Sequence, residues 1–430
     1  MKITNVGGAT AILEHKGKRI LFDPWLNEGI FHGAWYHFPP LRMGIEDLGR
    51  FDYIYISHIH EDHCAAGTIE YLNRDAEILL MDRRPNFVAK FLDTHGFEFK
   101  KVHHIAPFTP TELEDGLVVD MLTADPKHEL AFRIDSALIL NWDGFVVYNA
   151  NDCHPYEDGI QYILDTYPAI DLALLPYCGG SGYPACYTNL SHEEKVREQR
   201  RIRAEGLKSF SSTVSKLDPK YALPFADQYV IAGSRSPLNQ YMAHPPCPGE
   251  VEGTHKDTDT SSELLLLNSA QTFDFDSRKK SPDEPYEHFT EAERQEYIDE
   301  TLAKKTYDYD AFPLNPAVPL DRLIQHARDK MLESQRRENY FPDFSYYLDV
   351  PDREQRFRID FREESAQAVS WQSPLTEPYL RLSAPSTLMA LLLIGHISWN
   401  IADAALFLDY ERVPNDYDPK IHTYINFLKI

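Results

Sequence analysis

The feature that most constrains the fold of this 430-residue chain is a run of six positions, His58-Ile59-His60-Glu61-Asp62-His63. It directly follows residues 51–56, a short apolar segment of the kind that forms a buried strand. Two histidines two positions apart at a strand end can hold one metal ion, and Asp62 with His63 can hold a second ion. Imidazole and carboxylate ligands suit zinc or iron. The run therefore predicts a dinuclear metal site in a loop after a strand.

Two neighbouring metal ions also need an anionic ligand between them, because their charges repel. Asp152 is the best candidate, since it lies just past a predicted strand at 145–148. As an acidic group it is also a candidate catalytic residue that transfers protons. Asp227, directly after a predicted strand at 221–226, is a second candidate for catalysis or for the last ligand position of the second ion.

The first ion needs a third protein ligand, and the sequence leaves three residues open for it. His128 and Glu129 lie ahead of a predicted strand at 136–140, and Asp135 lies at its start. His128 is slightly preferred. Asp23 ends an earlier strand and either hydrogen-bonds a ligand histidine from behind or begins the turn before Pro24.

Residues 1–275 alternate between predicted strands and helices, as in an α/β fold. Turn residues predict hairpins around Lys16-Gly17-Lys18 and Trp142-Asp143-Gly144. Ser191 and Glu194 form a capping box ahead of a helix that reaches about residue 215. Residues 263–267 and 272–275 are expected to pair as a closing hairpin.

Residues 276–430 are predicted to form a second, mostly helical domain that covers the substrate or closes as a lid. The expected helices span 291–304, 320–337 and 386–406, and one short strand spans 356–361. A loop at 25–38 in the first domain, rich in tryptophan, phenylalanine and tyrosine, either covers the substrate or packs between the domains.

Charge and composition narrow the class of partner. With 43 lysine and arginine residues against 67 aspartate and glutamate residues, the net charge is −24, which argues against nucleic acid and anionic membranes as partners. The longest apolar run, 388–394, is far shorter than the roughly 20 residues of a membrane span. Five cysteines form no disulfide framework, and the first residues enter a strand pattern at once. A cytoplasmic location is expected.

The order Asp23-Pro24, His58-x-His60-x-Asp62-His63 and Asp152 resembles the metallo-β-lactamase superfamily over roughly residues 1–275. The resemblance implies an αββα sandwich with a dinuclear metal site at one edge of its sheets. More of the sequence is similar to the CMP-N-acetylneuraminate hydroxylase-like branch and to non-haem diiron monooxygenases. The stretches that carry this similarity are Asp23-Pro24-Trp25-Leu26, Ser57-His58-Ile59-His60, Asp135-Ser136, Asp152-Cys153, Gly179-Gly180-Ser181-Gly182-Tyr183-Pro184, Pro224-Phe225-Ala226 and, weakly, 399–414. In this comparison Asp135 falls beside an acidic position of the branch.

The sequence departs from these families at two places. It contains no Cys-x-His paired with Cys-x-x-His, so it encodes no Rieske cluster, and an oxygenase would depend on a separate ferredoxin or reductase. Many superfamily members place a final histidine on the second ion, whereas here the next histidine after Phe225 is His244. His154, Asp227 or water would then fill that position.

Two functions therefore follow from the same ligands. The favoured one is a diiron monooxygenase that hydroxylates a bulky small-molecule substrate with O2 and external electrons. The alternative is a di-zinc hydrolase of a phosphodiester, lactone or amide, in which the ions activate a water molecule.

Overall fold

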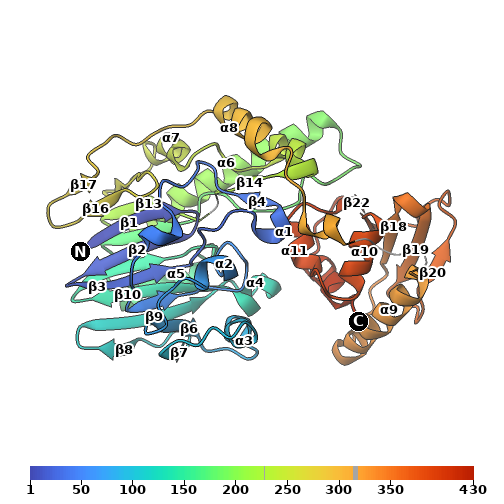
Figure 1. Ribbon diagram of the computed structural model, residues 1–430, viewed down its shortest axis with the longest axis horizontal. Coiled ribbons are helices and arrows are strands. Elements are labelled where there is room, and N and C mark those ends of the chain that lie inside the picture. The colour runs from blue at the N-terminus through green and yellow to red at the C-terminus, as the bar shows by residue number, and fades with distance from the viewer. Residues whose placement is uncertain (227, 313–317) are drawn as a thin grey trace.

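The computed structural model of the protein describes residues 1–226, 228–312 and 318–430. Two sheets lie face to face in the N-terminal part, and a smaller region built from the C-terminal residues lies beside them (Figure 1). Among the described residues, no helix is both long and apolar enough to cross a membrane.

The first sheet brings Asp23 and the histidine run to one edge. Strands β3 and β5 pair in parallel, with Phe22 opposite Tyr55, so the residues that follow both strands meet at the same end. The hairpin predicted around Lys16-Gly17-Lys18 is confirmed by the antiparallel pairing of β2 and β3. The strands, in spatial order, are β17 (Lys279–Ser281), β16 (Thr272–Asp274), β1 (Lys2–Gly7), β2 (Thr10–His15), β3 (Lys18–Phe22), β5 (Tyr53–Tyr55), β6 (Glu77–Met81) and β7 (Lys101–Ile105).

The second sheet brings Asp152 to the same edge. Strands β11, β12 and β13 are parallel neighbours, so the loops that follow them share one end of the sheet. The hairpin predicted around Trp142-Asp143-Gly144 is confirmed by β10 and β11. The strands, in spatial order, are β15 (Glu263–Leu264), β13 (Tyr221–Pro224), β12 (Leu172–Leu175), β11 (Phe145–Asn149), β10 (Ser136–Trp142), β9 (Leu117–Thr123) and β8 (Thr111–Glu114).

The closing hairpin expected from 263–267 and 272–275 is wrong. Strand β15 pairs with β13 in the second sheet, whereas β16 pairs with β1 in the first. The chain crosses between the sheets here, and Leu265 and Leu267 are buried in the core that the sheets enclose. Both segments are apolar because that core lies between them.

Helices cover both outer faces, so the architecture is the expected αββα sandwich. Helices α2 (Ala66–Ile69) and α3 (Phe87–Thr94) pack on the first sheet, and α5 (Glu157–Thr166) and α6 (His192–Leu217) pack on the second. The predicted capping box is present, because the Ser191 side chain accepts from the backbone of Glu194 and the Glu194 side chain accepts from Ser191. The other short helices of this part are α1 (Ile30–Gly33), α4 (Glu129–Ile134) and α7 (Val251–His255).

The C-terminal region contains the expected helices and also a sheet. The predicted strand at 356–361 is β19 (Gln355–Asp360). Around it lie β20 (Gln367–Val369), β18 (Ser345–Val350), β21 (Tyr379–Ser383) and β22 (Asp409–Val413). The helices are α8 (Glu291–Tyr297), α9 (Leu320–Glu338), α10 (Ser386–Leu393), α11 (Trp399–Ala404) and α12 (Pro419–Tyr424). The helix expected over 386–406 is divided at Gly395, whose φ of +71° ends α10.

The aromatic loop at 25–38 joins the two parts. Trp25, Phe31 and Trp35 are buried in one hydrophobic cluster with residues of α9, α10 and α11. The indole N–H of Trp35 donates to the carbonyl of Ala404 at 2.9 Å. Strand β17 continues the first sheet past residue 275, so the division of the chain at 275 stays a prediction. The packing holds α11 next to the edge where the histidine run lies.

Candidate metal centre

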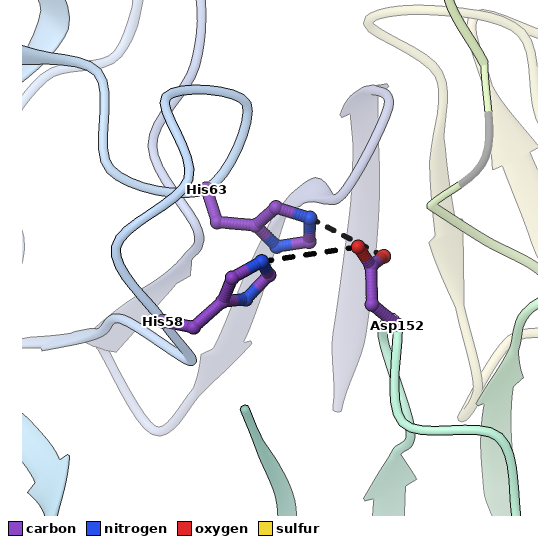
Figure 2. A group of neighbouring side chains, drawn as sticks. All are labelled: His58, His63 and Asp152. Carbon is purple, nitrogen blue, oxygen red and sulfur yellow. Dashed lines mark ion pairs between the residues drawn. The ribbon is translucent and has the colours of Figure 1, made fainter. Parts of the chain in front are cut away.

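Three of the predicted ligands meet at the edge of the sandwich. His58 and His63 come from the loop after β5, and Asp152 comes from the loop after β11 (Figure 2). The Nε2 atom of His63 lies 3.3 Å from Oδ1 of Asp152, and Nε2 of His58 lies 3.8 Å from Oδ2. One ligand atom from each residue lies within 4.8 Å of the others. Both histidines are buried, so their imidazoles face the carboxylate away from bulk water.

A buried carboxylate behind the histidines fixes their orientation. Asp23 accepts from the backbone N–H of Ser57 at 2.7 Å and from its hydroxyl at 2.9 Å. Oδ2 of Asp23 lies 3.0 Å from Nδ1 of His63, and the Ser57 hydroxyl lies 2.9 Å from Nδ1 of His58. A hydrogen on Nδ1 of each ring satisfies both contacts and directs both Nε2 atoms toward Asp152, where a metal ion would take the place of any second proton. Asp23 thus makes the contact expected of it.

Asp135, and not His128 or Glu129, lies beside His58. Its Oδ1 is 4.0 Å from Nε2 of His58, and that oxygen is buried without a hydrogen-bond partner among the described residues. Burial, and then the neighbouring Asp152, raises the pKa of the Asp135 carboxyl well above its usual range. Helix α4 separates the candidates, since His128 precedes it and Asp135 follows it at the start of β10. The slight preference for His128 is therefore not supported by the geometry.

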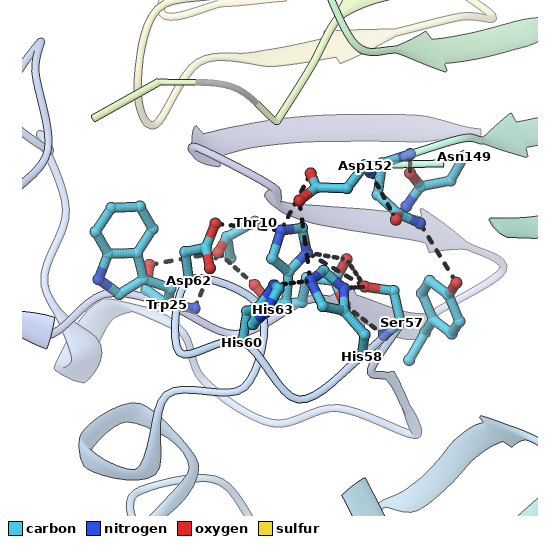
Figure 3. A network of polar contacts seen from close by, with 12 residues as sticks. Thr10, Trp25, Ser57, His58, His60, Asp62, His63, Asn149 and Asp152 are labelled. Carbon is cyan, nitrogen blue, oxygen red and sulfur yellow. Dashed lines mark hydrogen bonds and ion pairs between the residues drawn. The ribbon is translucent and has the colours of Figure 1, made fainter. Parts of the chain in front are cut away.

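His60 and Asp62 complete the group. Nδ1 of His60 lies 2.9 Å from Nε2 of His58, and Oδ2 of Asp62 lies 3.3 Å from Nε2 of His63 (Figure 3). The other ring nitrogen of His60, Nε2, lies 2.7 Å from the amide oxygen of Asn400 in α11. An amide oxygen only accepts, so the hydrogen of His60 is on Nε2 and its Nδ1 lone pair faces His58. Two facing lone pairs repel unless a cation lies between them.

The pKa values of the group are shifted by burial and by the charges of its own members. Burial, then His63 and His60, lowers the pKa of His58 well below its usual value. Burial alone would also lower the pKa of His63, but Asp152, Asp62 and Asp23 outweigh burial and raise it well above its usual value. Likewise burial would raise the pKa of Asp152, but His63 and His58 hold it below its usual range. A metal ion that displaces the His63 proton would satisfy the same carboxylates.

The orphaned atoms test whether the residues fit a metal. Nε2 of His63 and Oδ1 of Asp135 are both buried without a hydrogen-bond partner among the described residues. Unpaired buried polar atoms are costly, and here they belong to ligand-type groups that face one another. The donor groups therefore fit metal ions, and the residues that would hold them are His58, His60, Asp62, His63, Asp135 and Asp152.

The structure separates the candidates for the last ligand position. Asp227 lies outside the described residues. His154 lines the cavity next to Asp152, and burial lowers its pKa. His244 is buried against the ring of Tyr229, at 4.4 Å between centroids, and neither of its ring nitrogens has a hydrogen-bond partner among the described residues. No described contact joins His154 or His244 to the histidine run.

Two cavities meet at the site. The smaller, of about 160 Å³, lies against His60, Asp62 and Asp152 and is walled by Trp25, Phe31 and Trp35. The larger, of about 390 Å³, extends to His128 and to the C-terminal region, and we call it the chamber. Asp152, Gly180, Ser181, Asn400 and Asp403 line both. The aromatic loop at 25–38 and the glycine-rich stretch around Gly180 therefore both border the candidate metal centre.

Asn400 and Asp403 were missed as site residues. They lie almost 340 positions after the histidine run, and the sequence singled out only the stretch that contains them, 399–414, through a weak resemblance. A single asparagine or aspartate in a helix carries no local signal of a role. Only the packing of α11 against the aromatic loop brings them to the site.

Comparison with known proteins supports the fold. Residues 2–226 match the family described as "Beta-lactamase superfamily domain". A putative Rieske 2Fe-2S iron-sulfur protein from Mycolicibacterium smegmatis is 29% identical over 194 residues, 44% of this chain and 36% of that protein. The cytidine monophosphate-N-acetylneuraminic acid hydroxylase of Mus musculus is 29% identical over 279 residues, 63% of this chain and 44% of the hydroxylase.

Solved structures match at lower similarity. CmlA, a diiron beta-hydroxylase from Streptomyces venezuelae, is 17% identical with a TM-score of 0.41, covering 61% of this chain and 52% of that chain. Solved metal-dependent hydrolases reach similar TM-scores. The chain spans less than half the length of the two curated relatives above.

Proposed function

Because this chain belongs to the beta-lactamase superfamily, we propose that it uses the site described above as a dinuclear iron centre and hydroxylates a small molecule with O2. The proposal takes the metal-ligand group, the neighbouring cavities and the similarity to the hydroxylases as its support.

One observation carries the choice of iron. The residue that lies beside His58 is a carboxylate, Asp135, where a third histidine would favour zinc. Two histidines with one carboxylate and open positions are the ligands typical of non-haem ferrous oxygenases. With Asp152, Asp62 and His63 added, the residues that would hold the metal are half imidazole and half carboxylate.

The chain's own residues would position and shield this chemistry. Iron would supply the redox steps that activate O2. Asp23 and Ser57 keep the Nδ1 hydrogens on His63 and His58 and so direct Nε2 of each ring into the site. Trp25, Phe31 and Trp35 wall the small cavity and limit water. Asp152 is the proposed bridging ligand and proton acceptor, and Asp227 is a second candidate for proton transfer.

The reaction balances only with added electrons. One substrate C–H bond, O2, two electrons and two protons give one C–OH group and one water. The 430 residues hold no Rieske-type cysteine and histidine pattern, so we propose that the electrons come from an iron–sulfur protein or reductase outside them.

Metal analysis tests the proposal. Protein expressed with both iron and zinc available is expected to contain about two irons per chain and to consume O2 when a chemical reductant is added. Asp135→His, which restores a third imidazole, is the matched variant and should shift the metal content toward zinc. Two zincs per chain in the unaltered protein, with hydrolysis of a phosphodiester or lactone in the absence of O2, would overturn it in favour of a hydrolase.

A further inference from the structure

The chamber lies between the edge of the sandwich and the C-terminal region, and it opens into the small cavity beside the candidate metal centre. Its first wall is formed by α4 and the loops after β9 and β11, and includes Asp125 and Glu129. Its second wall comes from α11, β22 and α12, and includes Asp403. Because Asp152, Asn400 and Asp403 line both cavities, a molecule in the chamber can reach the metal-facing atoms.

Aromatic rings form much of the second wall. Tyr187 contacts Tyr183 edge to face at 4.9 Å and stacks on Tyr410 at 5.4 Å between centroids, and Tyr417 lies 5.7 Å from the ring of His422. All five of these residues line the chamber. The π face of a tyrosine ring is negative, so a box of such rings favours a cation wherever a face is turned inward.

A carboxylate stands inside this aromatic box. Asp403 accepts from the hydroxyl of Tyr410 at 2.8 Å, and its other oxygen lies 3.3 Å from Nε2 of His422. Although burial would raise its pKa, the contacts with His422 and Tyr410 lower the pKa of Asp403, so it is ionised at neutral pH. Asp125 and Glu129 add negative charge on the opposite wall.

The basic residues in the described lining of the chamber are histidines: His128, His154 and His422. Among its described lining residues there is no lysine or arginine. The guanidinium of Arg412 lies over the rings of Tyr187, Tyr183 and Tyr417 at 5.0, 5.5 and 5.7 Å and donates to Asn415. It does not line the chamber. Phosphate and carboxylate groups are commonly held by arginine or lysine, and the described lining of the chamber offers neither.

We propose that the chamber binds the substrate through an organic cation, a protonated or quaternary amine, held by Asp403 and the tyrosine box next to the candidate metal centre. This inference rests on the proposed function, because it takes the bound molecule to be the substrate of that reaction. It goes further by giving the substrate's charge and chemical class. It separates this chain from a site for nucleotide sugars, which carry phosphate. The overall charge of −24 would also draw a cation toward the protein.

Calorimetric titration of the full-length, zinc-loaded protein tests the inference without turnover. Choline is the probe, and 3,3-dimethylbutan-1-ol, which has the same shape without the charge, is the matched neutral compound. Choline is expected to bind at least ~10-fold more tightly than the alcohol. Asp403→Asn should weaken choline binding by about 10-fold and leave the alcohol unaffected. Glu98→Gln, an exposed carboxylate far from the chamber lining, should change neither.

A second variant keeps the test independent of folding. Tyr417→Leu removes one wall of the box at an exposed position and should weaken choline binding several-fold even if Asp403→Asn does not fold. Absent choline binding, equal binding of the alcohol, tighter binding of cytidine monophosphate, or unchanged affinity in the folded variants would overturn the inference. Because choline binding is measured on zinc-loaded protein without turnover, its failure would not affect the iron and O2 results that test the proposed function. Failure of the iron and O2 results would likewise not affect the choline result.

Discussion

Each metal-facing imidazole is held through its other ring nitrogen, and the three partners come from different parts of the chain. Asp23 after β3 holds His63, Ser57 after β5 holds His58, and Asn400 in α11 holds His60. A ring that is free to turn loses rotational entropy when it binds a metal, whereas a ring fixed by a hydrogen bond loses less. At the residue scale the three rings are therefore already oriented for the proposed metal ions.

His60→Ala should abolish stable binding of one metal ion and all activity, because it removes a proposed ligand. The fold should survive, since His60 lies in a partly exposed loop outside the main cores. Elemental analysis and thermal unfolding of the metal-free protein would check both statements. His95→Ala, at an exposed helix end, is the control and should keep both metals. Full metal content and turnover in His60→Ala would rule out the assigned site.

Asn400→Ala should weaken metal binding by roughly 10–100-fold, the usual effect of losing a hydrogen bond to a metal-bound histidine. Its amide oxygen lies 2.7 Å from Nε2 of His60 and fixes which nitrogen carries the hydrogen. Competition with a chelator would measure the change. Gln372→Ala, at an exposed position of the same region, should have no effect. Equal affinity in both variants would mean that Asn400 is only a packing residue.

His244 should make the protein sensitive to acid. Burial, then Arg294 and Arg203, lowers the pKa of its imidazole to about 3, against 6.5 when unfolded. The unfolded chain therefore binds a proton that the folded chain does not, and stability falls as pH drops from 6.5 toward 3. About 2–3 kcal/mol should be lost between pH 7.5 and pH 4.5 from this group.

The comparison with His244→Phe isolates this contribution, because phenylalanine keeps the contact with Tyr229 and cannot titrate. Urea unfolding of metal-free protein at several pH values should give a flatter acid side for the variant. Parallel curves for the two proteins would show that His244 is not buried as a neutral group.

At the element scale, the site depends on how α6 packs against the loop after β12. Gly180 and Ser181 of that loop line both cavities, and Gly206 of α6 lies against the start of the loop, at Tyr177 and Cys178. A Cβ atom at Gly206 would lie 2.6 Å from the carbonyl oxygen of Tyr177 and 2.9 Å from Cα of Cys178. Because these are backbone atoms, neither can rotate away.

Gly206→Ala should therefore destabilise the protein, although alanine favours a helix over glycine by about 1 kcal/mol. The clash should cost on the order of 1–3 kcal/mol, as overpacking does in other cores. Gly253→Ala in α7 is the matched control, because a Cβ there meets no atom within 4 Å, and it should be neutral or stabilising. Urea midpoints of the two variants would decide, and equal midpoints would mean that the loop yields to the new methyl group.

The elements that the sequence predicted well are those with a local chemical cause. The two hairpins around Gly17 and Gly144 follow from turn residues, and the start of α6 follows from Ser191 and Glu194. The predicted pairing of β15 with β16 is wrong. Two apolar segments separated by a short loop have the same sequence pattern whether they form a hairpin or belong to two different sheets. At the site, residue type and spacing identified the histidine run, but the choice of Asp135 over His128 depends on where α4 ends.

At the scale of the whole molecule, the aromatic loop beside the candidate metal centre and the C-terminal region share one hydrophobic cluster. Trp25, Phe31 and Trp35 pack with Leu388 and Trp399, and α11 supplies Asn400. No local pattern foretells this, because each aromatic residue of the loop would be equally buried by any apolar neighbour. Unfolding the C-terminal region would expose the loop that walls the site, so the two parts should not unfold independently.

Calorimetry of the whole chain should therefore show a single thermal transition. Bound metal should raise the midpoint temperature of that one transition. A ligand at 100 times its dissociation constant adds about 2.7 kcal/mol to the free energy of unfolding. If the shared cluster couples the parts, zinc should protect the backbone amides of β18 and β21, which lie far from the ligands, as well as those of β5. Hydrogen exchange with and without zinc would measure this. Trp35→Ala, which removes the indole contact with Ala404, should split the transition and confine the protection to the sandwich. Two transitions in the unaltered protein, with protection only near the histidine run, would show that the C-terminal region folds on its own and lends Asn400 to the site without stabilising it.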